Sequence, residues 1–227
     1  MKLDGINILV TAGGTEEPID GVRRLVNSST GATGLVIADR LRAHGADVLL
    51  LHSARVDVSG FQGEKTPFLT FDDLSDALEN LLSKRPFDAV IHLAAVSDYH
   101  LAGIEVDGKP LEPGERGKIG TGHELLLRLA PNPKLIDGLR EWSSNPDLAI
   151  VGFKLTDEGN QAKRTAKVRT LLQRGVADYV VHNDINEISV DQHIATVYSP
   201  LGVVAETQTK NELAEALCGL LAVGESS

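Results

Sequence analysis

Cysteine is almost missing from this chain, because Cys218 is the only one among 227 residues. An intrachain disulfide and a multi-cysteine zinc site are therefore excluded. Positive charge is also scarce: 22 Lys and Arg residues stand against 32 Asp and Glu, for a formal net charge of −10. Such a chain lacks the basic face that nucleic-acid-binding proteins present. We therefore expect no nucleic-acid partner.

Long apolar runs are missing as well, since none approaches the ~20 residues that a membrane span requires. The first ten residues also lack the basic and then apolar pattern of a secretion signal. We expect no membrane partner and a cytoplasmic location. What is present is ordinary for a globular protein, with 42% hydrophobic and 24% charged residues, so disorder is not expected.

Apolar runs alternate with helical periodicities along most of the chain. Continuous apolar runs predict buried strands at 6–11, 47–52, 87–93, 148–153 and 177–182. Amphipathic patterns predict helices at 30–44, 72–84, 133–142, 161–173 and 210–221. A further strand is predicted at 124–129, and a hairpin at 193–198 and 203–206.

This alternation is typical of a parallel sheet with right-handed crossovers. We predict a single α/β domain over residues 1–227, built on a doubly wound, mostly parallel Rossmann-like sheet. Between Asp98 and Gly122 the pattern lapses into a stretch rich in Gly, Pro and charge. That stretch is long for an idle loop, so we predict an inserted arm at about 99–124.

Ligands of open parallel sheets bind beyond the carboxyl ends of the strands. Two polar, glycine-containing segments, 13–20 and 27–34, converge on the end of the first predicted strand. Glycines allow the backbone to approach a phosphate, and the start of a helix offers unpaired N–H groups. A glycine turn followed by an ordinary helix cap is the structural alternative.

Polar residues also follow the later strands. The third predicted strand ends in small residues that include Ala95, against which a flat ring could lie, and then reaches Asp98. The fourth ends at Phe153-Lys154 and the fifth at Asn183-Asp184. Together these strand ends predict one polar crevice.

Familiar nucleotide motifs are missing. No Gly-x-x-x-x-Gly-Lys-Ser/Thr string occurs, and the glycines of a dinucleotide fingerprint are split here by the segment TEEPIDGVRRLVN. None of the three tyrosines has a lysine four residues later, as a short-chain dehydrogenase would need. An NAD(P)-dependent Rossmann-type reductase therefore stays only as an alternative.

Several long segments resemble one known family. TAGGTEEPIDGVRRLVNSSTGATG, AAVSDY, NPKLIDGLREW, VGFKL and ADYVVHNDINEISVDQHIATVY are similar to the free-standing phosphopantothenate–cysteine ligases of bacteria. The similarity extends from about Ile6 to Leu221. It implies a ligase of coenzyme A biosynthesis that joins 4′-phosphopantothenate to cysteine through an acyl-nucleotide.

The resemblance also implies roles for individual residues. Asn27 matches the asparagine that orients the acyl-nucleotide, and Lys118 the lysine of a mobile loop that closes over the triphosphate. Asp98 matches the aspartate that recognises the nucleotide. The remaining nucleotide-binding residues that it implies are Gly13, Gly31 and Gly34 at the phosphates, Ala95 against the base, and Phe153, Lys154 and Asn183 beside base and ribose.

The co-substrate implied by the resemblance is CTP, as in bacterial members, or ATP, as in eukaryotic ones, with Mg²⁺ carried on the nucleotide rather than on a protein metal site. The arm is implied to make a homodimer contact. After Lys118 the family commonly has Ile-Ser-Ser or Ile-Lys-Lys, whereas this chain has Ile119-Gly120-Thr121. A non-catalytic, nucleotide-binding relative therefore stays as a second alternative.

Overall fold

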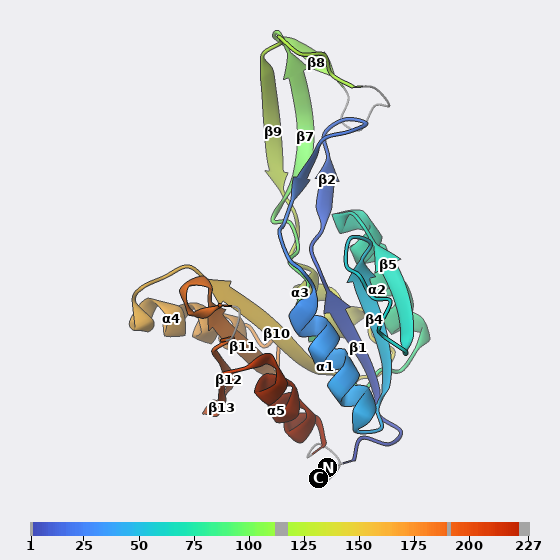
Figure 1. Ribbon diagram of the computed structural model, residues 1–227, viewed down its shortest axis with the longest axis vertical. Helices are drawn as coiled ribbons and strands as arrows, with labels where there is room; N and C mark the ends of the chain where they lie inside the picture. The colour runs from blue at the N-terminus through green and yellow to red at the C-terminus, as the bar shows by residue number, and fades with distance from the viewer. Residues whose placement is uncertain (1, 112–117, 190–191, 223–227) are drawn as a thin grey trace.

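A computed structural model of the chain describes residues 2–111, 118–189 and 192–222. An eight-stranded sheet forms its centre (Figure 1). From one edge to the other the strands are β13 (Gly202–Thr207), β12 (Ala195–Ser199), β11 (Tyr179–Asp184), β10 (Ala149–Thr156), β6 (Ala89–His92), β1 (Asn7–Ala12), β4 (Asp47–Ser53) and β5 (Glu64–Phe68). Strands β11 to β5 run parallel, and β12 and β13 form an antiparallel pair at the other edge.

Helices cover both faces of this sheet. α1 (Ala32–Ala43) and α5 (Lys210–Ala222) pack on one face, and α2 (Phe71–Lys84), α3 (Leu135–Trp142) and α4 (Gln161–Gln173) on the other. Alternation along the strands produces the two cores: Ile8 and Val10 join the core of α1 and α5, while Leu9 joins the other. The predicted doubly wound α/β fold is confirmed.

The helix starts follow local sequence signals. Thr70 caps α2 by accepting a hydrogen bond from the backbone N–H of Asp73, whose carboxylate accepts one from the Thr70 N–H in return. Asn160 caps α4 in a similar way, accepting from the N–H groups of Ala162 and Lys163. No helix among the described residues is long and apolar enough to cross a membrane.

Strand β5 was not predicted. Its sequence, EKTPF, is polar and largely exposed, and only Phe68 is buried. It pairs with β4 at the edge of the sheet, where one side of the strand faces solvent. An edge strand of this kind has no continuous apolar run, which is why periodicity missed it.

An arm projects from the main sheet (Figure 1), and it contains more regular structure than the sequence predicted for residues 99–124. It consists of a three-stranded antiparallel sheet, β7 (Tyr99–Val106), β8 (Lys109–Leu111) and β9 (Leu125–Pro131), beside the hairpin β2 (Glu16–Pro18) and β3 (Arg24–Val26). The predicted strand at 124–129 therefore belongs to the arm, which continues to Pro131 rather than ending near residue 124.

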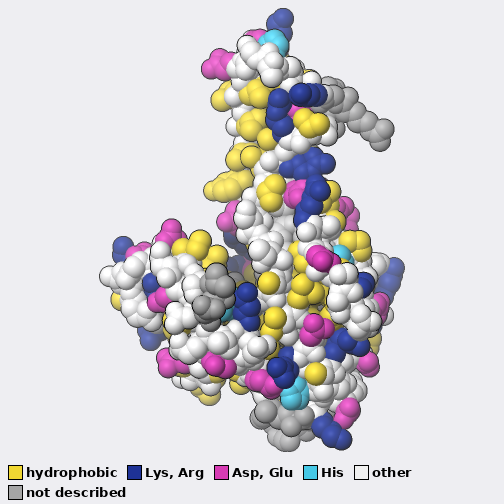
Figure 2. All heavy atoms as spheres, viewed as in Figure 1, with side chains coloured by type: hydrophobic (Ala, Val, Ile, Leu, Met, Phe, Trp, Pro, Cys, Tyr) yellow, Lys and Arg dark blue, Asp and Glu magenta, His cyan; other side chains and the backbone are white. Residues whose placement is uncertain are grey.

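Only a small core stabilises the arm. Ile19 from the hairpin packs with Leu101 and Ile104 from β7 and with Ile119. Other apolar side chains of the arm remain exposed: Tyr99 is 53% exposed, Leu126 59% and Leu129 45%. Figure 2 shows hydrophobic side chains on the surface of the arm. This surface differs from the inner strands β1, β4 and β6 of the main sheet, whose apolar residues are buried.

Asp20 clamps the hairpin to the residue after Lys118. It is buried, and its carboxylate accepts hydrogen bonds from the backbone N–H groups of Val22 (2.9 Å), Arg23 (2.7 Å) and Ile119 (3.1 Å). The Arg23 guanidinium forms an ion pair with Asp20 and donates to the Ile119 carbonyl oxygen. These hydrogen bonds, that of Val22 foremost, lower the pKa of Asp20 to about 2.

This clamp predicts a particular acid dependence. Since the folded pKa of Asp20 lies below its ordinary value of about 3.9, its contribution to stability is complete above pH ~4 and is lost as the pH falls towards 2. The NMR signal of the Ile119 amide should therefore stay in place as the pH falls through ~4. In Asp20→Asn the chemical shift of the Ile119 amide should differ from that of wild type at neutral pH. A wild-type chemical shift that changes with a midpoint near pH 4 would contradict the clamp.

Candidate functional site

The candidate site lies at the topological switch point of the sheet. The chain passes from β1 to its neighbour β4 on one side, and later returns to β6 on the other side of β1. Loops therefore leave in opposite directions at the carboxyl ends of β1 and β6, which is where open α/β sheets bind ligands. Two cavities open here, and Ala94 and Phe153 line both.

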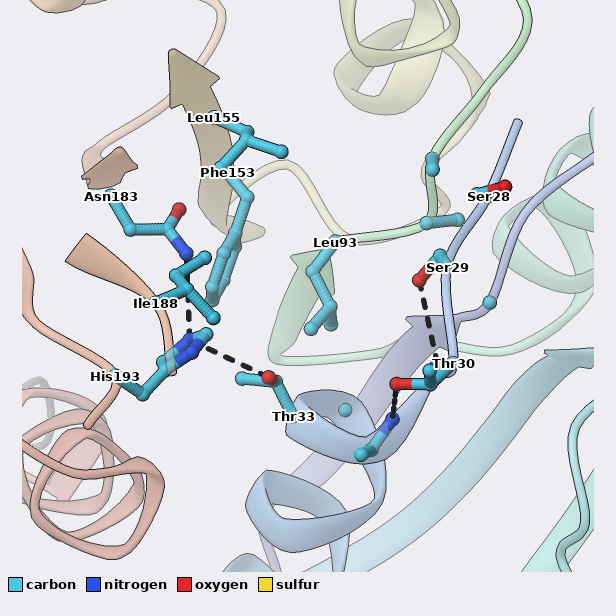
Figure 3. Close-up of a pocket in the computed structure, with 16 residues that line it drawn as sticks. Ser28, Ser29, Thr30, Thr33, Leu93, Phe153, Leu155, Asn183, Ile188 and His193 are labelled. Atoms are coloured by element: carbon cyan, nitrogen blue, oxygen red, sulfur yellow. Dashed lines mark hydrogen bonds between the residues drawn. The ribbon is translucent and has the colours of Figure 1, made fainter. Parts of the chain in front are cut away.

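The first, which we name the glycine cavity, has a volume of about 270 Å³. In Figure 3, Ser28, Ser29 and Thr30 lie on one side and Asn183 and His193 on the other. Its remaining lining residues are Gly13, Gly31, Ala32, Thr33, Gly34, Leu93, Ala94, Ala95, Phe153, Leu155 and Ile188. None of these residues carries a carboxylate.

The start of α1 forms the floor of the glycine cavity. Gly31 occupies the N-cap position with φ 71°, a left-handed conformation that favours glycine. No side chain caps the helix, and no acidic residue occupies its first turn. The first N–H groups of a helix have no intrahelical partner and carry partial positive charge. This floor is therefore suited to an anion.

Asn183 and His193 form the opposite wall. The Nε2 atom of His193 lies 3.4 Å from Asn183 Nδ2 and 3.5 Å from Thr33 Oγ1 (Figure 3). Burial, followed by the positive charge of Lys210, lowers the pKa of His193, so the imidazole is neutral at pH 7. Thr33 lies in the segment 27–34 that the sequence analysis singled out, whereas His193 was missed. The predicted hairpin that begins at residue 193 is the signal that could have identified this histidine.

The second cavity, which we name the lysine cavity, has a volume of about 430 Å³. Its cationic side chains come from three segments and are Lys134, Lys154, Lys167 and Arg174, whereas Asp98 is its only carboxylate among the described residues. Asp98 forms an ion pair with Lys134, and both side chains are more than half exposed. For Lys154 the described residues supply no ion-pair partner, which leaves it available to an anionic ligand.

Thr11 and His92 fix the strand ends between the two cavities. The Thr11 hydroxyl oxygen accepts hydrogen bonds from the backbone N–H groups of Leu93 (3.1 Å) and Ala94 (3.0 Å). Burial lowers the pKa of His92 to about 4, which keeps the imidazole neutral. Because the Thr11 oxygen already accepts two N–H groups, its hydroxyl donates to His92 Nδ1 at 3.1 Å. This histidine fixes the end of β6 and also lines the lysine cavity.

The predicted crevice is thus two cavities rather than one. Gly13, Gly31, Gly34, Ala95, Phe153 and Asn183 meet in the glycine cavity, as predicted for neighbouring strand ends. Asp98 and Lys154 line the lysine cavity instead. The residues are divided because successive side chains of β10 point to opposite faces of the sheet. Phe153 packs on the face covered by α1 and α5, so Lys154 points to the other face.

Asp184 is not a cavity residue, which corrects its place in the predicted crevice. It is fully buried, where it accepts a hydrogen bond from Thr156 Oγ1 (2.5 Å) and forms an ion pair with Arg164 at 3.3 Å. Arg164 also pairs with Glu187 at 2.6 Å. These groups attach α4 to the sheet, and hydrogen bonding, chiefly from Thr156, lowers the pKa of Asp184.

Asn27 lines neither cavity but lies at the edge of the glycine cavity, next to Ser28. Its Nδ2 donates a hydrogen bond to the carbonyl oxygen of Val96 at 3.0 Å, and its backbone N–H donates to Thr15 at 3.1 Å. One N–H of the side-chain amide therefore fixes its orientation while the other remains for a ligand. Lys118 is exposed and lines neither cavity; the Asp20 clamp holds its neighbour Ile119 against the turn of the β2–β3 hairpin in the arm.

Within the described ranges, no group of three or more His, Cys, Asp or Glu side chains is placed to hold a metal ion. Magnesium is commonly bound through substrate phosphates and one or two carboxylates, and it retains several waters.

Comparison with known proteins gives the same picture. Residues 3–223 match a family described as DNA/pantothenate metabolism flavoprotein C-terminal domain. The coenzyme A biosynthesis bifunctional protein CoaBC of Thermococcus kodakarensis is 32% identical over 217 residues, which cover 95% of this chain and 51% of that protein. The protein of the same name from Escherichia coli K12 is 31% identical over 191 residues, which cover 82% of this chain and 42% of that protein. The chain spans about half the length of the curated relatives it matches.

Solved structures share the fold. The crystal structure of the DNA/pantothenate metabolism flavoprotein from Streptococcus pneumoniae has a TM-score of 0.83 and 28% identity, and covers 97% of this chain and 100% of that one. A Cab2 mutant in complex with phosphopantothenate-cysteine has a TM-score of 0.74 over 98% of this chain and 89% of that one. At 18% identity, the latter likeness shows the fold alone.

Proposed function

The chain belongs to the DNA/pantothenate metabolism flavoprotein C-terminal domain family, and on that premise we propose that it is a phosphopantothenate–cysteine ligase. It would join 4′-phosphopantothenate to cysteine in coenzyme A biosynthesis. The observation that carries the proposal is the family match over residues 3–223, which contains every residue lining both cavities. The lining itself supports it, because an acidic protein here presents N–H groups, hydroxyls and cations to an anionic ligand.

The reaction consists of two transfers. A carboxylate oxygen of phosphopantothenate attacks the α-phosphorus of the nucleotide, and the bond to pyrophosphate breaks. The cysteine amine then attacks the acyl carbon, loses a proton, and displaces the nucleoside monophosphate. Both steps need cations and N–H donors where phosphate charge develops. In this proposal the α1 N-terminus, with Gly13, Gly31 and Gly34, holds the phosphates.

The nucleotide would span both cavities. Phe153 and Ala95 would pack against the base, Asp98 and Lys154 would bind base or ribose from the lysine cavity, and Asn183 would do so from the glycine cavity. We propose CTP as the co-substrate, with ATP as the alternative, and Mg²⁺ carried on its phosphates. Asn27, with one amide N–H unused, would orient the acyl carbonyl for attack.

Lys118 would approach the triphosphate from the arm. Lys118→Gln removes a positive charge and should slow pyrophosphate release about tenfold to a hundredfold, the effect of losing a hydrogen bond between charged groups. Lys109→Gln, the same change on the exposed strand β8, is the matched control. An unchanged rate in Lys118→Gln would make Lys118 an ordinary surface lysine.

The proposal is tested by measuring pyrophosphate release from purified protein with Mg²⁺, 4′-phosphopantothenate and cysteine, using CTP and ATP in parallel. Release that depends on phosphopantothenate supports the ligase and identifies its nucleotide. Nucleotide binding without release would favour the non-catalytic relative. Tight NAD(P) binding with hydride transfer would favour the reductase.

We also propose a homodimer in which the exposed apolar side chains of the arm, such as Tyr99 and Leu126, are covered by a second copy. Sedimentation at twice the chain mass of 24.3 kDa would support it, and sedimentation as a monomer would refute it. A cytoplasmic location fits a reaction that consumes nucleoside triphosphate, and fractionation of cells expressing the protein tests it.

A further inference from the structure

Thr15, between β1 and β2, is bonded to two other segments beside Asn27, although it lines neither cavity. It is fully buried, and its backbone N–H donates to the carbonyl oxygen of Ala95 at 3.1 Å. Its own carbonyl oxygen accepts the backbone N–H of Asn27 at 3.1 Å. Its hydroxyl oxygen accepts the backbone N–H of Ser97 at 2.9 Å. One buried residue thus joins the segments that follow β1, β3 and β6.

The peptide unit between Val96 and Ser97 is held at both ends. Its N–H is the group that donates to Thr15 Oγ1, and its carbonyl oxygen accepts the hydrogen bond from Asn27 Nδ2 at 3.0 Å. A peptide unit is planar, so the direction of its N–H sets the direction of its C=O. The Thr15 hydroxyl therefore determines where the acceptor of the Asn27 amide points.

These hydrogen bonds close a ring around Asn27. The Thr15 carbonyl holds the backbone of Asn27, and the Thr15 hydroxyl holds its side chain through the Val96–Ser97 peptide. Asn27 is half-buried, and a primary amide has two N–H groups in one plane. Fixing one of them against Val96 therefore also fixes the direction of the other, which remains for a ligand.

The hydroxyl is not needed to hold the strand ends together. The backbone N–H of Thr15 donates to Ala95, and the N–H of Ala95 donates in turn to the carbonyl oxygen of Gly13 at 2.8 Å. These two backbone hydrogen bonds join the ends of β1 and β6 whichever side chain residue 15 carries. What the hydroxyl adds is the orientation of a single peptide unit.

We propose that Thr15 is a positioning residue for the cysteine step. Its hydroxyl, acting through the Val96–Ser97 peptide, directs the remaining N–H of the Asn27 amide towards the acyl carbonyl. This inference rests on the proposed function, which gives Asn27 that role. Thr15 itself touches no substrate and takes no part in the activation step.

Replacing Thr15 with valine removes the hydroxyl but keeps the branched shape of the side chain. The Ser97 N–H then loses its acceptor, so the peptide and the Asn27 amide lose their fixed direction. The cysteine step should slow about tenfold, the value of one hydrogen bond, while activation keeps its rate. Thr15→Ser restores the hydroxyl and should restore the rate. Thr207→Val, which removes a buried hydroxyl bonded to Ala195 and remote from both cavities, is the matched control.

Rapid acid quenching with mass spectrometry measures both steps, and thermal unfolding verifies that each variant is folded. The acyl-nucleotide should accumulate in Thr15→Val but not in Thr15→Ser or Thr207→Val. Should Thr15→Val fail to fold, Thr15→Ala removes the same hydroxyl without placing a methyl group against the Ser97 N–H, and the same result is expected. An unchanged cysteine step, or equal slowing of both steps, would overturn the inference.

A double variant tests whether Thr15 acts through Asn27. Aspartate cannot donate to the Val96 carbonyl oxygen, so in Asn27→Asp the hydroxyl has no amide to direct. Thr15→Val/Asn27→Asp should therefore carry out the cysteine step no more slowly than Asn27→Asp alone. If the two losses multiply instead, the residues act independently and the inference is wrong.

NMR of the protein without substrates separates this inference from the ligase proposal. The side-chain amide signals of Asn27 should shift and exchange faster with water in Thr15→Val, but not in Thr207→Val. If wild type is a ligase and these signals do not change, the inference fails alone. If wild type has no phosphopantothenate-dependent turnover, the ligase proposal fails; changed signals would still support positioning of Asn27 by Thr15, and unchanged ones would overturn it.

Discussion

Replacing Gly14 with alanine is expected to lower ligase turnover by about a hundredfold. A Cβ atom at Gly14 would lie 1.8 Å from the carbonyl oxygen of Asn27 and 3.0 Å from its carbonyl carbon. Both are backbone atoms, so no side-chain rotation can relieve the clash. Either the segment after β1 or the segment after β3 must move by about 1 Å, a displacement that typically costs about 10²-fold in rate.

The same movement would disturb the contacts that join these loops. Gly14 bridges to Ala95, and the Asn27 N–H donates to Thr15. Turnover and thermal unfolding should be measured together, so that loss of activity in a folded protein is distinguished from unfolding. Gly60→Ala is the control, since a Cβ there meets nothing within 4 Å. Unchanged turnover in folded Gly14→Ala would show that the position of Asn27 does not matter.

Replacing Asn27 with aspartate should separate the two half-reactions. The carboxylate of aspartate cannot donate to the Val96 carbonyl oxygen, which the Asn27 amide reaches at 3.0 Å, and it cannot donate to an acyl carbonyl either. Removing such a donor from a developing oxyanion typically costs roughly a hundredfold to a thousandfold in rate. The step with cysteine should slow by this factor, while activation continues.

Rapid acid quenching followed by mass spectrometry measures this directly, because the acyl-nucleotide should accumulate in Asn27→Asp and stay undetected in wild type. Asn160→Asp is a matched control, since aspartate caps a helix such as α4 as well as asparagine does. Full turnover in Asn27→Asp, or loss of activation itself, would show that the assigned role is wrong.

The inner strands of the central sheet could be predicted because they are buried on both faces. The runs INILVT and DVLLLH can be recognised from the sequence alone, since their apolar residues alternate between the two buried cores. The arm could not be predicted in the same way. Strand β7 is only partly buried, and its pairing with β9 joins residues such as Tyr99 and Pro131 that are distant in sequence.

The sequence predicts at which strand ends the candidate site lies, but not how the residues there are divided between two cavities. Parallel strands bring Gly13, Ala95, Phe153 and Asn183 to one edge, whatever the details of packing. The division into two cavities follows from alternation along β10, which the sequence analysis did not apply to Phe153 and Lys154.

His193 was missed for a different reason. It reaches the cavity only because β12 runs antiparallel beside β11, with His182 opposite Thr196. That register depends on the turn between the two strands rather than on an apolar pattern.

The central claim, ligation through an acyl-nucleotide, is tested most directly by the stoichiometry of products from one reaction mixture. Purified protein would be incubated with Mg²⁺, nucleoside triphosphate, 4′-phosphopantothenate and cysteine, and all products quantified by mass spectrometry and phosphorus NMR. The account predicts equal amounts of phosphopantothenoylcysteine, nucleoside monophosphate and pyrophosphate. Nucleoside diphosphate with inorganic phosphate, or no amide product at all, would contradict it.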